Sequence, residues 1–380
     1  MRPDTRLLFI TAWPLDTLGG IQTLVRNLAG ALARTPGIHV SAITGAMPGA
    51  PTVALRTRPP ESIRLPFEPK PRPDWLPPHR ELIGRACLQG LDQAVAESRP
   101  DVVITVSHHS AEAHQAARAA AALGVPWVIW PLVHADATQH VSPTAVKLYR
   151  DAALVVASSS VERRWLIEDA GLPASRILLL ECGSWAAERP MRLPRPLRPG
   201  EPVTLLTVGE LSAHKRIADQ VEAVARLHAE GLEARLTIAG VARGRWELDR
   251  LTRIARDRRV EQSVRLMPDA PESTLEALHG SADCFLFTSA SESFGLVLLD
   301  AICAGVFPIV YPHATYAGLV EGSGFGRVTA RATPEALAAA IRRAIDDREP
   351  RVGPLTAWRD AHTWARVAAS LLARLRELPS

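Results

Sequence analysis

Residues 285–310, with the sequence FLFTSASESFGLVLLDAICAGVFPIV, constrain the fold of this chain more than any other stretch. Short apolar runs stand at both ends, and their length and composition are typical of buried strands in a parallel sheet. Between them lie a polar loop with a glycine and an apolar helical run, which Gly305 is well suited to stop. The sequence therefore predicts a strand, a tight loop, a helix and a second strand, in that order.

The predicted helix begins just past the carboxyl end of a strand, so its free N–H groups point at whatever is bound there. Ser293 is a candidate N-cap, and the amides of Phe294, Gly295 and Leu296 would then have no partner within the helix. A phosphate group is the ligand that suits this geometry.

Two carboxylates flank the start of the predicted helix. Glu292 lies in the loop before it, and Asp300 lies inside it on an otherwise apolar face. A ribose diol or an arginine would satisfy Asp300, because burying a carboxylate without a partner costs several kcal/mol. In the alternative interpretation, Glu292 is a helix-capping acid and Asp300 is a solvated or ion-paired residue.

A chain of 380 residues is too long for one ordinary core, so two domains are expected. The clearest boundary is a stiff linker with prolines at positions 190, 194, 196, 199 and 202. It separates a first domain, residues 1–195, from a second domain that begins at residue 200. Residues 46–79 are rich in proline and show no clear period, and residues 311–322 contain glycine, so both are expected to be loops.

The loop after another predicted strand, residues 203–208, carries a cation. Lys215 ends this loop and opens the next helix, with Arg216 beside it. A cation at that place can neutralise phosphate charge. An exposed lysine without a binding role is the alternative.

The first half has glycines and histidines at similar places. Gly19 and Gly20 follow a predicted strand and precede a helix, which allows a backbone to approach a ligand closely. His134 comes just past a predicted strand, on the rim where open α/β sheets bind ligands, although a lone histidine is more often structural. His108 and His109 follow another strand and are either acceptor contacts or surface histidines.

Composition excludes several classes of function. The net charge of +4 is too small to imply nucleic-acid binding, and no RNA- or DNA-binding motif is present. No signal peptide and no apolar run of about 18 residues is found, so we expect a cytoplasmic protein with at most peripheral membrane contact. The four cysteines lack metal-like spacing and are expected to be free thiols.

The stretch from Glu292 to Gly305 resembles the E-x-F-G-x-x-x-x-E-A-x-x-x-G signature of retaining glycosyltransferases with the GT-B fold. This is the large family called glycosyltransferase family 4, or group 1, which includes the glycogen-synthase-like sugar transferases. Asp300 stands where the signature has its second glutamate, and its side chain is one methylene shorter.

A second block, residues 209–216, resembles the family's G-R-L-x-x-x-K-G pattern and matches it at Lys215. Glu210 replaces the arginine of the pattern, and Arg216 replaces its final glycine. Residues 182–185, CGSW, keep only the glycine of the family's Asn-Gly-Val-Asp.

Three first-half and terminal features also resemble the family. The Gly19–Gly20 turn is similar to its amino-terminal glycine loop, which faces the donor diphosphate and the acceptor. The segment that ends in His134 is similar to a strand whose histidine approaches the transferred sugar. Trp364 is similar to the tryptophan before the terminal helix, and a packing role is expected for it.

The resemblance implies an α/β protein of two Rossmann-like domains facing each other across a cleft. The first domain would bind the acceptor, and the terminal helix, residues 360–380, would cross back onto it. The second domain, residues 200–359, would bind a nucleoside-diphosphate sugar. A hexosyl-type group would pass to a hydroxyl acceptor with retention of anomeric configuration.

The resemblance also implies roles for the residues. Glu292 would hold the hydroxyls of the sugar, His134 would contact its opposite side, and these two are the predicted catalytic residues. Asp300 would bind the ribose. The remaining predicted donor-binding residues are Gly19, Gly20, Lys215, Arg216, Phe294, Gly295 and Leu296.

No Asp-x-Asp cluster offers the usual metal site, so we expect no divalent metal and no cofactor besides the donor. The acceptor would be a sugar, a natural product or a lipid-linked molecule, the last for an enzyme docked on a membrane. UDP, GDP, ADP and dTDP sugars all stay open as donors. The alternative from another class is a GT-B-fold protein that binds nucleotide or sugar without transfer, an interpretation that rests on Glu210 and Asp300.

Overall fold

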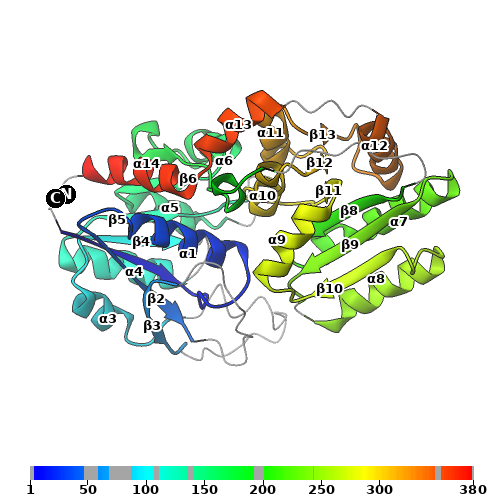
Figure 1. Cartoon of the computed structure of the whole chain (residues 1–380). Helices are drawn as coiled ribbons and strands as arrows, with labels where there is room; N and C mark the ends of the chain where they lie inside the picture. Colours follow the sequence, from blue (N-terminus) through cyan, green and yellow to red (C-terminus); the bar gives the residue numbers. More distant parts are fainter. Residues whose placement is uncertain are drawn as a thin grey trace. The chain divides into compact units, whose positions relative to one another are not determined.

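The structure of the chain is a computed structural model (Figure 1). It describes residues 4–46, 59–67, 87–106, 111–134, 141–191, 201–242, 244–346 and 352–378. The chain forms two compact units. The amino-terminal unit comprises Met1–Gly183 and Trp364–Ser380, and the carboxyl-terminal unit comprises Ser184–Thr363.

The amino-terminal unit is built on a seven-stranded parallel sheet with the order β3-β2-β1-β4-β5-β6-β7. Its strands are β1 (Thr5–Thr11), β2 (Ile38–Gly45), β3 (Glu61–Leu65), β4 (Val102–Val106), β5 (Trp127–Trp130), β6 (Leu154–Ala157) and β7 (Ile177–Leu179). Its helices are α1 (Gly20–Leu32), α3 (Leu91–Ser98), α4 (Ala111–Leu123), α5 (Pro143–Asp151), α6 (Ser160–Glu168) and α14 (Trp364–Arg376).

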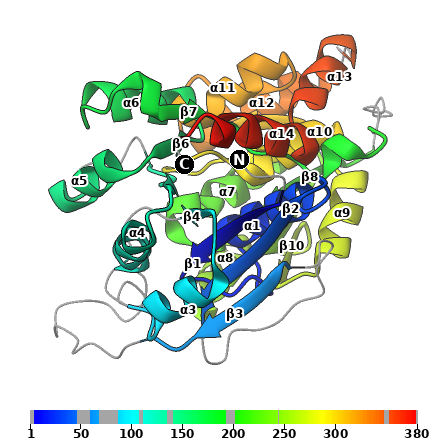
Figure 2. The ribbon, with the colours of Figure 1, turned by 90° about the vertical axis from the view of Figure 1, so that its left-hand side faces the viewer.

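Helices cover the faces of this sheet because its central strands are mostly apolar and almost entirely buried. Leu8 and Ile10 of β1 pack with α3 to α6 on one side, whereas the alternate residues Leu7 and Phe9 are buried on the other. Figure 2 turns this unit toward the viewer, and α14 lies against α1. The expectation that the terminal helix returns to the first domain is therefore confirmed.

The carboxyl-terminal unit is built on a six-stranded parallel sheet with the order β10-β9-β8-β11-β12-β13. Its strands are β8 (Val203–Val208), β9 (Ala234–Gly240), β10 (Val264–Pro268), β11 (Cys284–Phe287), β12 (Phe307–Val310) and β13 (Arg327–Val328). Its helices are α7 (Ile217–Ala229), α8 (Arg245–Asp257), α9 (Glu272–Ser281), α10 (Leu296–Ala304), α11 (Ala314–Ser323), α12 (Pro334–Asp346) and α13 (Val352–Ala361).

The strand order places the functional edge of each sheet. The order reverses between β1 and β4 in one unit and between β8 and β11 in the other. In open α/β sheets, ligands bind beyond the carboxyl ends of the strands at such a reversal. The predicted α/β fold of two parallel-sheet domains is confirmed, and the loops after β8 and β11 must emerge side by side.

Two expected loops contain secondary structure. Strand β3 lies within residues 46–79, and the pattern hid it because it is a mostly exposed edge strand with polar residues. Helix α11 lies within residues 311–322, where the side chain of His313 caps it by accepting a hydrogen bond from Thr315 N at 3.3 Å. Tyr316, buried inside this helix, anchors it to the sheet through Ser289.

The segment that enters the carboxyl-terminal unit is bound to the segment that leaves it. Ser184 N donates to His362 O at 2.8 Å. The buried Arg359 donates from Nη2 to the carbonyls of Ala186 and Arg189, both at 2.7 Å. In the amino-terminal unit, Trp364 packs directly on Gly183, where a Cβ would approach the indole to 2.6 Å.

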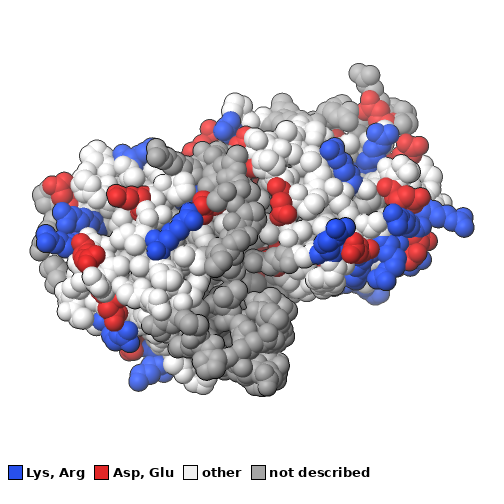
Figure 3. All heavy atoms as spheres, turned by 90° about the horizontal axis from the view of Figure 1, so that it is seen from below, with Lys and Arg blue, Asp and Glu red and all other residues white. Residues whose placement is uncertain are grey.

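Charged side chains are mixed rather than segregated. On the face that Figure 3 shows, Lys and Arg side chains lie among Asp and Glu side chains. Within the described ranges, no helix combines the length and the apolar character that crossing a membrane requires.

The ends of β8 and β9 meet at a contact that only glycine permits. Gly240 has φ of +134°, and a Cβ on it would lie 1.9 Å from Gly209 O. Gly209 N donates to Ala239 O at 3.0 Å, so neither backbone can withdraw without breaking the sheet. This contact sets the spacing of the two strand ends beside the loop that carries Lys215.

We expect Gly240→Ala to lower the free energy of unfolding by about 3 kcal/mol or more, because backbone meets backbone. The matched control is Gly280→Ala in α9, where a Cβ meets nothing within 4 Å. That change should be neutral or stabilising by about 0.5–1 kcal/mol, because alanine favours helices. Urea unfolding of the full-length variants measures both, and equal stabilities would contradict the close-contact argument.

Candidate functional site

The predicted cation and acid meet at the carboxyl edge of the carboxyl-terminal sheet. Lys215 ends the loop after β8, and Glu292 lies in the loop after β11. Lys215 Nζ forms an ion pair with Glu292 Oε1. The side chains are 20% and 12% exposed, so both charges are largely withdrawn from water.

Backbone contacts fix the loop that carries Lys215. Thr288 Oγ1, at the end of β11, donates toward the carbonyls of Lys215 at 2.9 Å and Arg216 at 3.2 Å. Gln220 Nε2 donates to Thr288 Oγ1 at 2.8 Å, which orients that hydroxyl. Ala290 N also donates to the carbonyl of His214, the residue before Lys215, at 2.7 Å. The two loops are therefore linked through their backbones as well as through the ion pair.

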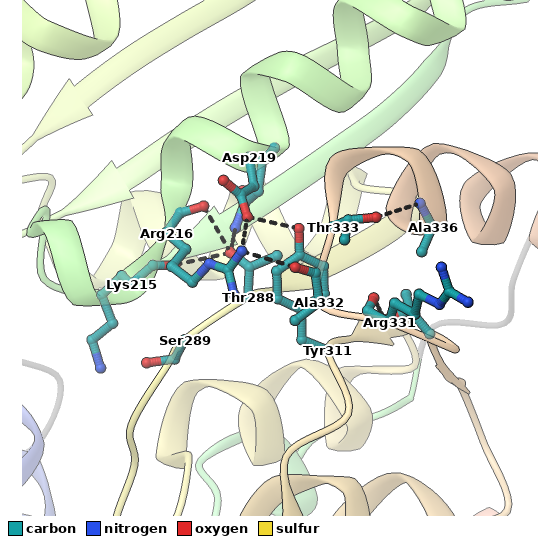
Figure 4. A network of polar contacts seen from close by, with 12 residues as sticks. Lys215, Arg216, Asp219, Thr288, Ser289, Tyr311, Arg331, Ala332, Thr333 and Ala336 are labelled. Carbon is teal, nitrogen blue, oxygen red and sulfur yellow. Dashed lines mark hydrogen bonds and ion pairs between the residues drawn. The ribbon is translucent and has the colours of Figure 1, made fainter.

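Arg216 lies beside Lys215, but its guanidinium forms hydrogen bonds with other residues of the protein (Figure 4). Nη2 donates to Asp219 Oδ2 at 2.6 Å and to Ala332 O at 2.8 Å, and the guanidinium lies 5.0 Å from the centre of the Tyr311 ring. Tyr311 Oη donates to the same Asp219 oxygen at 2.9 Å. Burial first, and then the Asp219 carboxylate, raises the pKa of Tyr311.

Figure 4 shows the Lys215 side chain directed away from this network. The backbone of Arg216 is left-handed, with φ of 52°, which explains why the related pattern has glycine here. Arg216 thus ties the loop after β8 to the start of α12. Its predicted role in donor binding stays a prediction.

Helix α10 begins two residues later than expected. Its N-cap is Gly295, with φ of 101°, and no side chain caps it, so the expectation that Ser293 is the cap was wrong. A residue with positive φ at the cap turns the chain sharply, which glycine allows and serine does not. Phe294 is buried next to this turn. The predicted amides of Phe294, Gly295 and Leu296 therefore lie at the helix start that follows Glu292.

Asp300 has a partner that the sequence did not suggest. Ser184 Oγ donates to Asp300 Oδ1 at 2.6 Å, and the same hydroxyl accepts from Ala186 N at 3.1 Å. Asp300 is 8% exposed. One turn along α10, burial and then the Asp300 charge raise the pKa of the Cys303 thiol to about 12. The carboxylate connects α10 to the segment that enters this unit, and its contact with a ribose stays a prediction.

The predicted residues of the amino-terminal unit lie at the carboxyl edge of their own sheet. Gly19 is the N-cap of α1, and a Cβ on it would approach the Gln22 side chain to 2.2 Å, whereas Gly20 has open space. His134 follows β5 and is partly buried. His108 and His109 lie outside the described residues.

Sequence reasoning missed the residue that holds the loop before Gly19. Arg26 of α1 is completely buried. Its Nη1 donates to the carbonyls of Leu15 at 2.8 Å and Thr17 at 2.9 Å. The only signal in the sequence was an arginine within an amphipathic helix, which is more often a solvated residue.

Two protein-family models match this chain. A model described as "Glycosyl transferases group 1" matches residues 192–353, and one described as "Glycosyl transferase 4-like domain" matches residues 19–183. The chain belongs to the group 1 glycosyltransferases. The two matches cover the two compact units, and the family that the residues 292–305 resemble is confirmed.

Curated relatives match part of this group 1 chain. It is 32% identical to a glycogen synthase of Mycobacterium tuberculosis over 265 residues, which is 66% of this chain and 61% of that protein. It is 31% identical to a GDP-mannose:cellobiosyl-diphosphopolyprenol alpha-mannosyltransferase of Komagataeibacter xylinus over 143 residues, 38% of this chain and 35% of that one. The match therefore spans about three fifths of the first relative and about a third of the second.

A solved structure matches over nearly the full length. Anabaena HepE in complex with UDP and glucose has a TM-score of 0.72 and 16% identity, covering 98% of this chain and 99% of that one. With only 16% identical residues, this structural similarity shows the fold of the present chain, which is GT-B, and nothing about its substrates.

The Arg216 network generates a prediction about stability. Arg216→Ala should lower the free energy of unfolding by about 2 kcal/mol, because it removes charged hydrogen bonds and keeps a side chain at positive φ. Arg216→Gly should lose about 1 kcal/mol less, since glycine accepts that backbone. Urea unfolding measures both.

The control for that series is Arg342→Ala, which removes an exposed ion pair with Glu230. We expect it to change stability by about 0.5 kcal/mol or less. If Arg216→Ala were as stable as this control, the network would contribute nothing to the loop.

Proposed function

We propose that this chain is a glycosyltransferase that moves a hexosyl-type group from a nucleoside-diphosphate sugar to a hydroxyl acceptor, with retention of configuration. One observation carries the proposal. Lys215 and Glu292, a cation and an acid in loops after adjacent strands, meet at the strand-order reversal of a parallel sheet, next to the start of α10. That place suits a diphosphate with a sugar attached.

In this proposal, groups of opposite charge contact different parts of the donor. The Lys215 ammonium and the amides of residues 294–296 would neutralise and orient the diphosphate. The loop of Gly19 and Gly20 would lie near the diphosphate, since glycine allows a close approach of the backbone. Glu292 would accept hydrogen bonds from the sugar's hydroxyls, His134 would hydrogen-bond the sugar from its opposite side, and Asp300 would bind the ribose. Because Lys215 and Glu292 already pair, each is oriented before the donor arrives.

The reaction needs one bond to break and one to form. The bond between the anomeric carbon and the phosphate oxygen breaks, and the acceptor oxygen bonds to that carbon on the same face. The acceptor's proton passes to the departing phosphate oxygen. We propose that lysine and amide groups meet the developing phosphate charge, so that transfer continues without a divalent metal.

The comparisons support this choice of donor and suggest acceptors. A relative from Komagataeibacter xylinus is named for GDP-mannose and a diphosphopolyprenol acceptor, and Anabaena HepE was solved with UDP and glucose. Another relative, from Mycobacterium tuberculosis, is 30% identical over 180 residues and is named a GDP-mannose-dependent phosphatidylinositol dimannoside mannosyltransferase. A sugar, natural-product or lipid-linked acceptor is therefore proposed.

Glu292→Ala should reduce transfer about a hundredfold, the scale of losing an electrostatic contact at the reacting centre. The donor is first chosen by thermal shift against UDP, GDP, ADP and dTDP sugars, since a ligand at about 100 times its Kd stabilises by about 2.7 kcal/mol. Product formation is then measured with and without EDTA. Glu230→Ala, a 55% exposed acid of the same unit, is the control and should transfer at the normal rate.

Three outcomes would count against this function. Normal transfer by Glu292→Ala removes that assignment. Loss of transfer in EDTA contradicts metal independence. Binding of a nucleotide sugar with neither transfer nor hydrolysis supports the alternative of a non-catalytic binding protein.

The predicted ribose contact of Asp300 can be separated from its contact with Ser184. Asp300→Asn should lower the affinity for the nucleoside diphosphate of the identified donor about 10-fold or more. It should hardly change the affinity for the 2′,3′-dideoxy analogue of that nucleotide. Ser184→Ala should leave both affinities unchanged and lower stability by about 1–3 kcal/mol. Calorimetric titration measures the affinities, and equal weakening of both nucleotides would contradict a ribose contact.

A further inference from the structure

The start of α6 carries the sequence of a capping box but forms only one of its two usual hydrogen bonds. Ser159 is the N-cap, and its side chain accepts from Glu162 N at 3.1 Å. In a capping box, the glutamate at this spacing would return to the backbone N–H of the N-cap residue. Here Glu162 Oε2 accepts from Ser158 N at 2.7 Å, and Oε1 accepts from Val133 N at 2.6 Å. The carboxyl group thus bridges α6 and the turn after β5.

That turn has a backbone that needs external support. Leu132 has φ of 54°, a left-handed conformation that costs a non-glycine residue about 1–2 kcal/mol. Leu132 and Val133 are buried, so the Val133 N–H must find a partner inside the protein. A second hydrogen bond joins β5 to the start of α6: Nε1 of Trp130, the last residue of β5, donates to Ser158 Oγ at 2.6 Å. The next residue after this fixed turn is His134.

We propose that Glu162 is a positioning residue that holds residues 131–134 in the conformation that presents His134 to the transferred sugar. Glu162 touches neither donor nor acceptor in this proposal and acts on transfer only through His134. The inference rests on the proposed function, because it requires His134 to contact the sugar.

The burial of Glu162 supports a local role. The side chain is completely buried, and burial raises its pKa to about 8 against the opposing effect of the hydrogen bonds from Ser158 and Val133. Tyr149 of α5 is the titratable group facing it, and burial followed by Glu162 raises the tyrosine's pKa. A buried carboxyl group is costly to stability, so its retention is explained by the backbone N–H groups that it satisfies.

The sign of the pH effect follows from that shift. The folded state holds the proton of Glu162 up to pH of about 8, whereas the unfolded chain releases it above its ordinary value of 4.5. This group therefore makes the free energy of unfolding fall as pH rises between those values. Glu162→Gln should remove that part of the decline.

The test uses Glu162→Gln in the full chain, with Leu166→Ala as its matched control. Glutamine keeps the volume but places an N–H₂ group against one of the two donors, which releases the turn. We expect kcat to fall about tenfold to a hundredfold, because a small misplacement of a reacting contact is enough, with unchanged affinity for the nucleotide. Leu166 is buried on the same helix, and its removal should destabilise α6 without changing kcat at temperatures where the protein is folded.

A double-mutant cycle with His134→Ala tests the route of the effect. In the His134→Ala background, Glu162→Gln should cause no further loss of the residual rate. Hydrogen exchange at the Val133 amide gives a readout that needs no activity, and it should accelerate in Glu162→Gln but not in Leu166→Ala.

The outcomes separate the two proposals. Wild-type protein that transfers no sugar contradicts the proposed function, while the exchange rate of Val133 still tests the tie to Glu162. Wild-type activity in Glu162→Gln, or an equal loss with and without His134, overturns the positioning role and leaves the glycosyltransferase proposal intact.

Discussion

Burial of both faces of two parallel sheets is the constraint on which the rest of the structure depends. The residues of β11 are all apolar and buried, and so is the middle of β1, Leu7–Ile10. Groups that bind a ligand are therefore expected at the carboxyl ends of the strands, where the loops emerge. Lys215, Glu292 and His134 all lie in segments that follow the carboxyl end of a strand, and the order of each sheet decides which of these loops become neighbours within a unit.

The ion pair of Lys215 and Glu292 shows what that arrangement provides. Each charge is largely shielded from water, and leaving either one unpaired would be more costly than keeping the pair. In the proposed function, a diphosphate would attract the ammonium while sugar hydroxyls donate to the carboxylate, so a bound donor would replace one internal contact with two. The loop would keep its conformation during this exchange, because Thr288 holds its backbone independently of the side chain of Lys215.

The sequence assigns Lys215 and Glu292 to one donor site, because strand patterns locate both loops and each residue lies in a block that resembles the family, but it does not predict their ion pair. Nor does it predict the partners of Arg216 and Asp300. Arg216 meets Ala332 and Ser184 meets Asp300, each across 116 residues. Ala332 lies in no motif, and Ser184 is a position at which residues 182–185 depart from the family's pattern. Strand β3 was missed for a different reason: it is a short, mostly exposed edge strand with prolines on both sides, and its two apolar residues are too few to mark a strand.

Loops at these edges share one physical problem: their backbones lack the regular partners of strands and helices. The structure answers it with side chains from neighbouring elements. Arg26 donates to two carbonyls of the loop after β1, Glu162 accepts from the turn after β5, and Arg216 reaches the carbonyl before α12. Long side chains with several donor or acceptor atoms suit this task, because they span the gap and can meet two backbone groups at once. Such residues can influence a site without touching a ligand, because they hold the backbone of the loops that form it.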